Sequence, residues 1–513
     1  MPQARHCNGP CLILIGKAMT EDTAGQQTPR TWNGPSLAGL TTLAKRHQTA
    51  LVATAFAFLT FSVYWYLGPQ DTVYINHVYQ ADAFLHGRLD LGQDYPWLEV
   101  AYKDGKVYEV HPPMPAIIIL PGVALFGQAL NQTLVSAVIG ALCAPLVFGI
   151  VRKFTEKLSA QVWLTVLYLF GTIFWYSASH GGVWFFTHTV GVFFLLLAVY
   201  ATLVTKSPLL AGLFLGAAFW SRQPMILALP FFLIMFSDQW LSGSLEKPLL
   251  KRIDIVPMIK LGLGVGLFVA LALEYNNLRF GSPFDYGSDY SKQATDQPAL
   301  YNHGPFDISY IPRHIPAVFE LTPVFQSNAP YIIPSFLGMA LWATTPAFFY
   351  SLFANLRDWR VVLVGGTLMF VALYVIVSRN VSAGLGWEWV RLGVPQDLPH
   401  DLNLVPFFAM ISLAIAAGLR YRDKLVIACW SAIIPVALLL FSFAATGWAQ
   451  FGYRYGLDFY PFLFLLTIRG IGEEVKWHHK LLIVVSVAIN LWGVLWIYQF
   501  DPRQFLDLRW VTI

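Results

Sequence analysis

Charged residues are scarce in this chain of 513 residues, and their scarcity decides its broad class. Asp, Glu, Lys and Arg make up 12% of the sequence, about half of the roughly 25% that soluble domains carry. Hydrophobic residues make up 56%. This composition excludes an ordinary soluble domain and predicts an integral membrane protein. The formal net charge of +4 gives no reason to expect a nucleic-acid partner.

Cysteine is also rare, and several catalytic motifs are missing. The four cysteines, two near the N-terminus and two within apolar runs, give neither a disulfide framework nor a set of metal ligands. There is no Walker phosphate loop and no glycine-rich dinucleotide motif. These absences argue against an ATP-driven transporter and against an enzyme with a cytosolic nucleotide-sugar domain. We predict no metal site and no cofactor, and leave open whether a divalent ion assists.

Long apolar runs are what the chain has instead. A bilayer is crossed by about twenty apolar residues, or fewer in a half-buried helix. The runs predict an all-α membrane protein with about thirteen transmembrane helices, or roughly eleven to thirteen. They begin near Ala50, Leu134, Val162, Phe185, Leu209, Pro224, Val256, Ser335, Val361, Leu404, Leu425, Leu457 and Leu481.

Two stretches need separate treatment. Ala116–Leu130 is apolar, but counting it as a span would destroy the charge asymmetry of the loops, and Pro115 and Pro121 each remove a backbone donor. We predict an interfacial or re-entrant segment there. The two short runs that begin near Leu209 and Pro224 are expected to form a tight pair that meets at Ser221-Arg222-Gln223.

Basic residues set the predicted orientation. They fall in loops on one side if every run crosses once, and the positive-inside rule makes that side the cytoplasm. We therefore predict a multi-pass protein of the cell membrane, with its N-terminus in the cytoplasm and its C-terminus outside. Residues 1–45 lack the features of a secretory signal and are predicted to be a disordered cytosolic tail. Residues 46–513 are predicted to form a single transmembrane domain with long outer loops at 70–113, 276–334 and 378–403.

The outer loop 70–113 carries seven carboxylates and closes on His111-Pro112-Pro113. Unstructured loops of this length are usually functional. Apolar positions at helical spacing over Val73–Leu85 predict an amphipathic helix at the membrane surface, which Gly87 ends. Asp71 either caps that helix or is catalytic. Asp82 either lies on its solvated face or is catalytic, and the residues alone leave both choices open.

Several motifs together resemble the GT-C superfamily of membrane glycosyltransferases. The closest similarity is to the branch that contains the protein O-mannosyltransferases and the lipid A aminoarabinose transferases. The similarity extends over residues 50–470 and is carried by Ala81–Leu91, Asp104–Pro113, Asn277–Phe284 and Trp448–Tyr455.

The resemblance implies a glycosyltransferase that depends on a polyprenyl-phosphate sugar, such as an undecaprenyl-phosphate sugar. The sugar would pass, with inversion, from the lipid monophosphate to a lipid, glycan or protein acceptor on the outer face. Members use a first-loop carboxylate as general base, so Asp82 and Asp71 are the catalytic candidates. Asp82 is favoured because it lies in the stronger match. Members commonly carry two adjacent acids here, whereas Thr72 follows Asp71 in this chain.

The departing lipid phosphate needs a cation where its charge develops. Arg454 is the first candidate, because it lies on the predicted outer side between Tyr453 and Tyr455 and arginine suits phosphate by its planar fork of donors. The alternative is an interfacial anchor that snorkels outward. Arg222 is the second candidate, and its alternative is a structural ion pair with a first-loop acid.

Four further residues and one loop complete the predicted site. His111 binds the phosphate, orients the base or is structural, and Glu99 supports an arginine or a sugar hydroxyl. Tyr453 and Tyr455 are the other predicted supporting residues. The loop 276–334 mixes aromatic, acidic and amide side chains, which suits an acceptor platform but also an ordinary interface loop.

Other functions remain open from the sequence. A multi-span transporter or a flippase for lipid-linked sugars also buries charged residues between spans. A lipid-linked oligosaccharide polymerase or ligase would share the carrier and the compartment. Membrane lipids are expected partners in every case.

Overall fold

The computed structural model describes residues 37–241, 253–325, 331–335, 337–356, 359–383, 404–447 and 450–499. The chain divides into two compact units, residues 1–50 and residues 51–513. The predicted disordered tail, residues 1–45, lies outside the described residues except for 37–45, which begin helix α1 (Leu37–Leu67). All of the following concerns the second unit.

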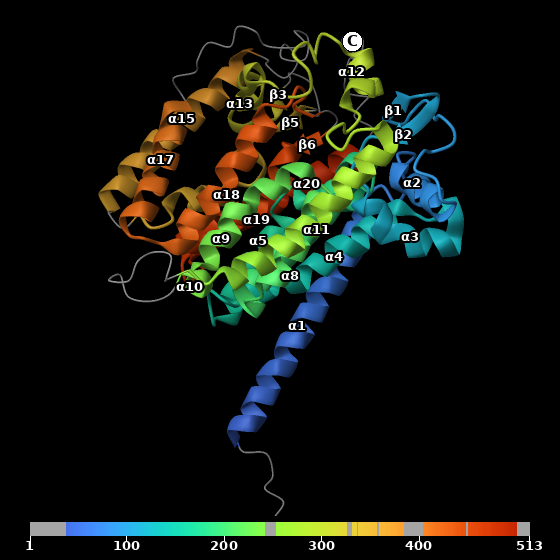
Figure 1. The fold of residues 1–513 in the computed structure, drawn as a ribbon. Coiled ribbons are helices and arrows are strands. Elements are labelled where there is room, and N and C mark those ends of the chain that lie inside the picture. The colour runs from blue at the N-terminus through green and yellow to red at the C-terminus, as the bar shows by residue number, and fades with distance from the viewer. Residues whose placement is uncertain are drawn as a thin grey trace, which may run out of the picture. The chain divides into compact units, whose positions relative to one another are not determined.

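The described part of this unit is mostly helical (Figure 1). Its longer helices are α2 (Asn76–Leu85), α3 (Met114–Phe126), α4 (Gln132–Val151), α5 (Leu158–Phe170), α6 (Phe174–His180), α7 (Val183–Tyr200), α8 (Pro208–Phe219), α9 (Leu229–Met235), α11 (Ile255–Phe280), α13 (Ile311–Phe319), α15 (Trp359–Ala383), α17 (Val405–Arg420), α18 (Lys424–Phe441), α19 (Tyr460–Ile471) and α20 (Trp477–Gln499). Shorter pieces include α10 (Ser237–Trp240), α12 (Lys292–Asp296), α14 (Leu341–Thr344), and the 3-10 helices η1 (Gly127–Ala129), η3 (Gln223–Ala228), η7 (Pro346–Phe353) and η9 (Arg454–Asp458).

Seven helices in the described ranges are long and apolar enough to cross a membrane, or eight if the bent pair α5 and α6 is one span. A multi-span helical membrane protein is thus confirmed, but the full set of about thirteen spans is not reached. Four of the predicted runs form shorter apolar helices, in α8, η3 with α9, α17 and α19. A helix of 12 residues such as α8 is about 18 Å long, well short of the roughly 30 Å of hydrocarbon. The run expected from Ser335 forms β5, α14 and η7 instead of one long helix.

Glycine allows α8 and α11 to pack closely. A Cβ on Gly212 of α8 would lie 2.1 Å from the Leu261 carbonyl oxygen, and one on Gly264 of α11 would lie 2.3 Å from the Leu213 nitrogen. Gly212 and Gly216 are four residues apart on one face of α8, the small-xxx-small spacing that brings membrane helices together. This contact anchors α8, which leads directly into the turn that holds Arg222.

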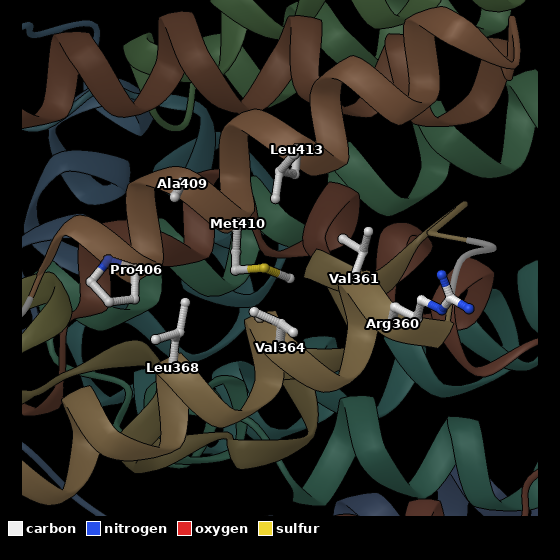
Figure 2. Close-up of a pocket in the computed structure, with 9 residues that line it drawn as sticks. Arg360, Val361, Val364, Leu368, Pro406, Ala409, Met410 and Leu413 are labelled. Atoms are coloured by element: carbon white, nitrogen blue, oxygen red, sulfur yellow. The ribbon is translucent and has the colours of Figure 1, made fainter.

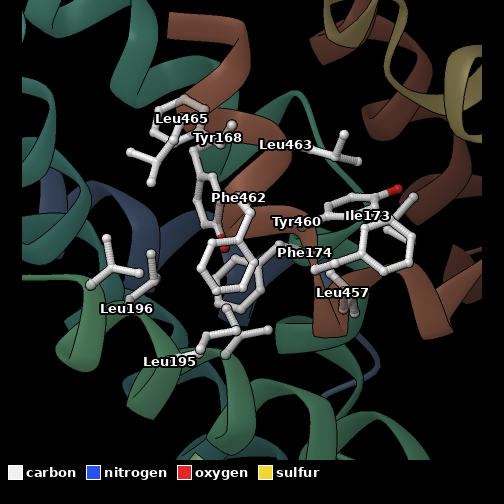
Figure 3. Close-up of a cluster of buried hydrophobic side chains, with 14 of the residues drawn as sticks. Tyr168, Ile173, Phe174, Leu195, Leu196, Leu457, Tyr460, Phe462, Leu463 and Leu465 are labelled. Atoms are coloured by element: carbon white, nitrogen blue, oxygen red, sulfur yellow. The ribbon is translucent and has the colours of Figure 1, made fainter. Parts of the chain in front are cut away.

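An aromatic core packs against η9. Figure 3 shows Tyr168 of α5, Phe174 of α6 and Phe462 of α19 packed around one another with leucines of α7. Leu457, within η9, is fully buried in this core. Because one residue of the short turn is fixed in the core, its neighbours Arg454 and Asp458 are held in place.

Three small two-stranded sheets were not expected from the sequence, which predicted helices only. β1 (Val100–Lys103) and β2 (Lys106–Glu109) form a hairpin closed by Asp104 and Gly105, both with positive φ of 52° and 71°, as a two-residue hairpin turn requires. β3 (Val324–Phe325) pairs with β4 (Ile332–Ile333), and β5 (Leu337–Met339) pairs in parallel with β6 (Gln450–Gly452). The last pair joins residues 337–339 to the segment before Arg454.

Helix α2 begins three residues later than predicted and buries polar as well as apolar residues. It ends at Leu85, and Gly87 follows with φ 68°, which confirms the predicted stop. Asp71 does not cap it: the residue before the helix is Ile75, and no side chain caps the start. Asn76 and His77 are fully buried, whereas Leu85 is 42% exposed. Its buried side therefore carries polar side chains beside the apolar Val78 and Ala81.

The other local predictions can be compared directly. The apolar segment after His111 forms α3, a 13-residue helix with Pro121 inside, which is too short for a span and lies beside α2 (Figure 1). The short pair α8 and η3–α9 meets at residues 220–222, as expected. Most of the predicted outer loop 378–403 lies outside the described residues.

Candidate functional site

Glu99 stands immediately before β1 and faces the first turn of α7. The indole nitrogen Nε1 of Trp184 donates a hydrogen bond of 2.5 Å to Glu99 Oε2. This side chain remains 15% exposed. Among the described residues, no cation donates a hydrogen bond to it. Glu99 is therefore a fixed and partly accessible carboxylate.

His111 and Glu109 form a tight pair beside Glu99. Glu109 Oε1 lies 2.5 Å from His111 Nδ1, and Asn76 Nδ2 donates to Glu109 Oε2 at 2.7 Å. Burial disfavours the charged imidazole, but the Glu109 carboxylate outweighs burial and raises the pKa of His111. Burial likewise disfavours the ionised Glu109, and the charge of His111 outweighs it and lowers the pKa of Glu109. Both shifts favour the ion pair, and His111 Nε2 lies 3.9 Å from Glu99 Oε2.

The polar face of α2 braces this pair. His77 Nδ1 lies 3.1 Å from Gln80 Oε1, and Gln80 Nε2 donates to the Tyr275 hydroxyl of α11. Burial lowers the pKa of His77 to about 4, so the ring is neutral and adds no charge. The rings of His77 and His111 are 6.1 Å apart. The inward face of α2 is therefore a neutral scaffold for a charged pair.

Arg222, in the turn between α8 and η3, pairs with Asp458 at the end of η9. Its Nε donates to both Asp458 oxygens at 3.3 Å, and its Nη2 donates to Oδ2 at 3.1 Å. The fully buried Asp458 also lies 2.9 Å, through Oδ1, from His188 Nδ1 of α7. Burial favours the neutral carboxyl, but Arg222 keeps the pKa of Asp458 below its ordinary value. The sequence predicted a first-loop acid as the alternative partner of Arg222, and that partner was wrong.

Arg454 begins η9, one turn before Asp458. Its guanidinium carbon lies 5.2 Å from the centre of the Tyr455 ring and 5.5 Å from that of Phe185. The guanidinium carbon of Arg222 lies 5.6 Å from the same Tyr455 ring. The two predicted phosphate-binding arginines, from parts of the chain 232 residues apart in number, thus approach one aromatic ring.

The electrostatic interactions join the arginines to the first loop. The charge of Arg222 acts on His111, as does that of Glu99. Tyr301, from the loop 276–334, has a buried hydroxyl. Burial together with Tyr455 and Glu99 raises the pKa of Tyr301, while Arg454 opposes the rise. We call the set of Glu99, His111, Arg222, Arg454 and Tyr455 the polar cluster.

Tyr453, the other supporting residue predicted, does not point at an arginine. Its hydroxyl lies 2.8 Å from Nδ1 of His314 on α13, and His314 Nε2 lies 2.8 Å from the Phe443 carbonyl oxygen. The ring of Tyr453 meets that of Tyr455 edge-on at 5.7 Å. Tyr453 therefore fixes α13 next to Tyr455 of the polar cluster.

The structure does not bring the two predicted bases into the polar cluster. Asp71 is exposed, and its Oδ1 accepts from the neighbouring Thr72 backbone nitrogen at 2.7 Å. Asp82 accepts from Gln128 Nε2 at 2.9 Å and lies 3.6 Å from His86. At about 100° per residue, Asp82 lies on the face of α2 opposite the buried Asn76 and His77. Their catalytic role stays a prediction.

Three residues with clear structural roles here were missed by sequence reasoning: Trp184, His188 and Asp458. Trp184 and His188 are four residues apart, so they share one face of α7. Asp458 follows Arg454 by the same spacing. A polar residue one turn from an arginine within an apolar region was a usable signal, because a charge there needs a partner.

Two apolar grooves lie apart from the polar cluster. Figure 2 shows one of about 310 Å³ between α15 and α17, with Val364, Leu368 and Met410 along it and Arg360 at one end. The other, of about 660 Å³, lies over α8 and α11. Their linings are those of lipid-facing surfaces. No group of three or more potential metal ligands occurs among the described residues.

Comparison with known proteins does not assign the chain to a family. The chain matches no protein-family model, and no curated protein or solved structure is significantly similar to it. The function must therefore be argued from the polar cluster itself.

Proposed function

We propose that this protein is a polyprenyl-phosphate-sugar-dependent glycosyltransferase of the GT-C type. One observation carries the proposal. Arg222 and Arg454 approach the same Tyr455 ring, and the charge of Arg222 acts on His111, which lies 3.9 Å from the partly exposed carboxylate of Glu99. Two arginines together with such an acid suit a reaction in which a phosphate leaves while a hydroxyl loses its proton.

In the proposed reaction, Glu99 takes the proton of the acceptor hydroxyl. The hydroxyl oxygen then forms a bond to the anomeric carbon, and the bond from that carbon to the phosphate oxygen breaks. The lipid phosphate leaves with the electron pair and is stabilised by Arg222 and Arg454. Attack from the face opposite the phosphate inverts the anomeric carbon. No metal is needed for this charge balance.

Glu99 is preferred over the two aspartates for geometric reasons. A general base must reach its proton and be held in one orientation. Trp184 holds one oxygen of Glu99, and His111 lies 3.9 Å away. Asp82 and Asp71 are bonded to groups outside the polar cluster. We propose that His111, kept charged by Glu109, orients Glu99.

The proposed placement in the membrane follows the sequence argument. The polar cluster lies on the outer face of the cell membrane, the N-terminus lies in the cytoplasm and the C-terminus lies outside. The shorter apolar helices α8, α9, α17 and α19 complete the bundle to about thirteen crossings or part-crossings. The acceptor reaches Glu99 from the outer side, and the lipid carrier enters from the bilayer.

Native mass spectrometry tests the donor class. Protein purified from its membranes in mild detergent is expected to carry a polyprenyl monophosphate or its sugar derivative. Arg222→Gln with Arg454→Gln should remove that lipid while leaving bound phospholipids in place. A wild-type protein without bound polyprenyl phosphate, or one whose bound carrier is a diphosphate, would contradict the proposal.

A vesicle assay separates this enzyme from a flippase. Reconstituted protein should consume polyprenyl-phosphate sugars and release free polyprenyl phosphate when an acceptor is present. Movement of intact lipid-linked sugar between leaflets without cleavage would indicate a transport function instead.

A further inference from the structure

Asp458 and His188 hold one edge of the Arg222 guanidinium and leave the other edge open. Asp458 accepts from Nε and Nη2. The donors of Nη1 lie on the far side of the planar group, and among the described residues they make no hydrogen bond. Arg222 is 18% exposed, whereas Asp458 and His188 are at most 1% exposed.

This arrangement fixes the direction in which Arg222 can donate. A free arginine side chain loses rotamer freedom when it binds a ligand. Here two hydrogen-bonded atoms on Asp458 and the ring of Tyr455 already restrain the guanidinium. His188 in turn restrains Asp458 at 2.9 Å. The open edge is therefore presented in one orientation.

We propose that Asp458 and His188 are positioning residues, which hold Arg222 so that its open edge receives the phosphate of a polyprenyl-phosphate donor. This inference rests on the proposed function, because it takes the donor to be a lipid monophosphate. An arginine with one edge anchored and one edge free can bind two phosphate oxygens at once. A neutral lipid alcohol would gain nothing from this geometry.

Asp458→Asn separates positioning from simple charge balance. Removing a negative charge next to Arg222 would tighten phosphate binding if Asp458 only offset the charge of the arginine. Positioning predicts the opposite. The neutral amide offers one acceptor oxygen in place of two, and its NH2 group cannot accept from Nε. Arg222 is then held less firmly and binding weakens by about tenfold, the usual effect of losing one hydrogen bond to a charged group.

The binding experiment compares polyprenyl phosphate with the polyprenol of the same length, using purified protein in neutral-lipid nanodiscs. Wild type should prefer the phosphate. Arg222→Gln should lower that preference by about 10- to 100-fold, and Asp458→Asn by about tenfold. The double variant should match Arg222→Gln, because Asp458 acts only through Arg222. Asp423→Asn is the matched control, since it breaks another Arg–Asp pair, with Arg469 at 2.8 Å.

His188→Phe is a second test of the positioning role, in case Asp458→Asn does not fold. It keeps a ring of similar size and removes only the contact to Asp458, and it should weaken phosphate binding by about threefold. Unchanged or tighter phosphate binding in folded Asp458→Asn and His188→Phe, with loss in Arg222→Gln, would overturn the positioning role and leave the proposed function standing. Absence of any phosphate preference in wild type would overturn the proposed donor itself.

Discussion

Replacement of Glu99 by Gln tests the proposed chemistry at a single atom. The amide has the same shape, and its oxygen still accepts from Trp184 Nε1, which lies 2.5 Å from the carboxylate in the wild type. The variant therefore keeps the position of the side chain and loses its basicity. A positioned general base contributes about 10²–10⁴-fold. We expect kcat to fall by that factor, about 2.7–5.5 kcal/mol in activation free energy, with little change in donor affinity.

The assay is single-turnover transfer in vesicles, with the polyprenyl-phosphate sugar that supports wild-type turnover. Asp82→Asn and Asp71→Asn are the matched controls, because they remove the same charge from the same loop but outside the polar cluster. Both controls should retain most of the activity. A nearly active Glu99→Gln together with an inactive Asp82→Asn would refute the assignment of the base and restore the one favoured by the sequence.

Three further predictions follow from the geometry. Trp184→Phe removes the donor that holds Glu99 Oε2 and should lower kcat by about 10- to 100-fold, measured in the same transfer assay; an unchanged kcat would show that the indole only packs. His111→Asn should destabilise the protein most at pH values between the lowered pKa of Glu109 and the raised pKa of His111. The stabilisation from the ion pair is lost as pH falls through the pKa of Glu109 and as pH rises through the pKa of His111. The difference in melting temperature between wild type and variant, measured against pH, tests this, and a pH-independent difference would contradict it. Gly264→Ala should destabilise the packing of α11 on α8, because its Cβ would lie 2.3 Å from a backbone nitrogen. Gly262→Ala on the same helix meets nothing within 4 Å and should be neutral or stabilising by up to about 1 kcal/mol. Equal melting temperatures of the two variants would contradict the close packing.

The residues of the polar cluster that could be found from the sequence share one property. Arg222, Arg454 and His111 interrupt or border apolar runs, and an ionisable group there requires a partner or a ligand. That requirement is local and can be recognised in a single sequence. The identity of the partner is not local: Arg222 and Asp458 are 236 positions apart. The sequence therefore indicated the cations, while the acid that pairs with Arg222 required the fold.

The span count differed for a related reason. Hydropathy measures apolar length, but it does not measure whether a run stays in one helix. Pro224 and Pro346 each stand within the first two residues of a 3-10 helix, and the apolar runs around them are divided into short pieces. Such pieces are tolerated where protein, and not lipid, surrounds the broken backbone. The sequence thus located the apolar segments and overestimated how many are long single helices.

Helix α2 has a buried side that the sequence could not reveal. Apolar residues of a surface helix usually face the core and its charged residues face water. In this protein the buried side of α2 is mixed, with the polar Asn76 and His77 fully enclosed beside Val78. It contacts the charged pair of Glu109 and His111, which no periodicity can reveal.

Three acids that are buried or partly buried, Glu99, Glu109 and Asp458, have different hydrogen-bond partners. Glu109 accepts from Asn76 and pairs with His111, and Asp458 pairs with Arg222 and His188. Each of these carboxylates is bonded to a cationic partner and is at most 1% exposed, so its basicity is low and no acceptor can reach it. Glu99 differs in its hydrogen bond and in its exposure. It accepts from the neutral indole of Trp184, has His111 3.9 Å away, and is 15% exposed. The contrast assigns proton transfer to Glu99 and leaves the other two acids to hold His111 and Arg222 in place.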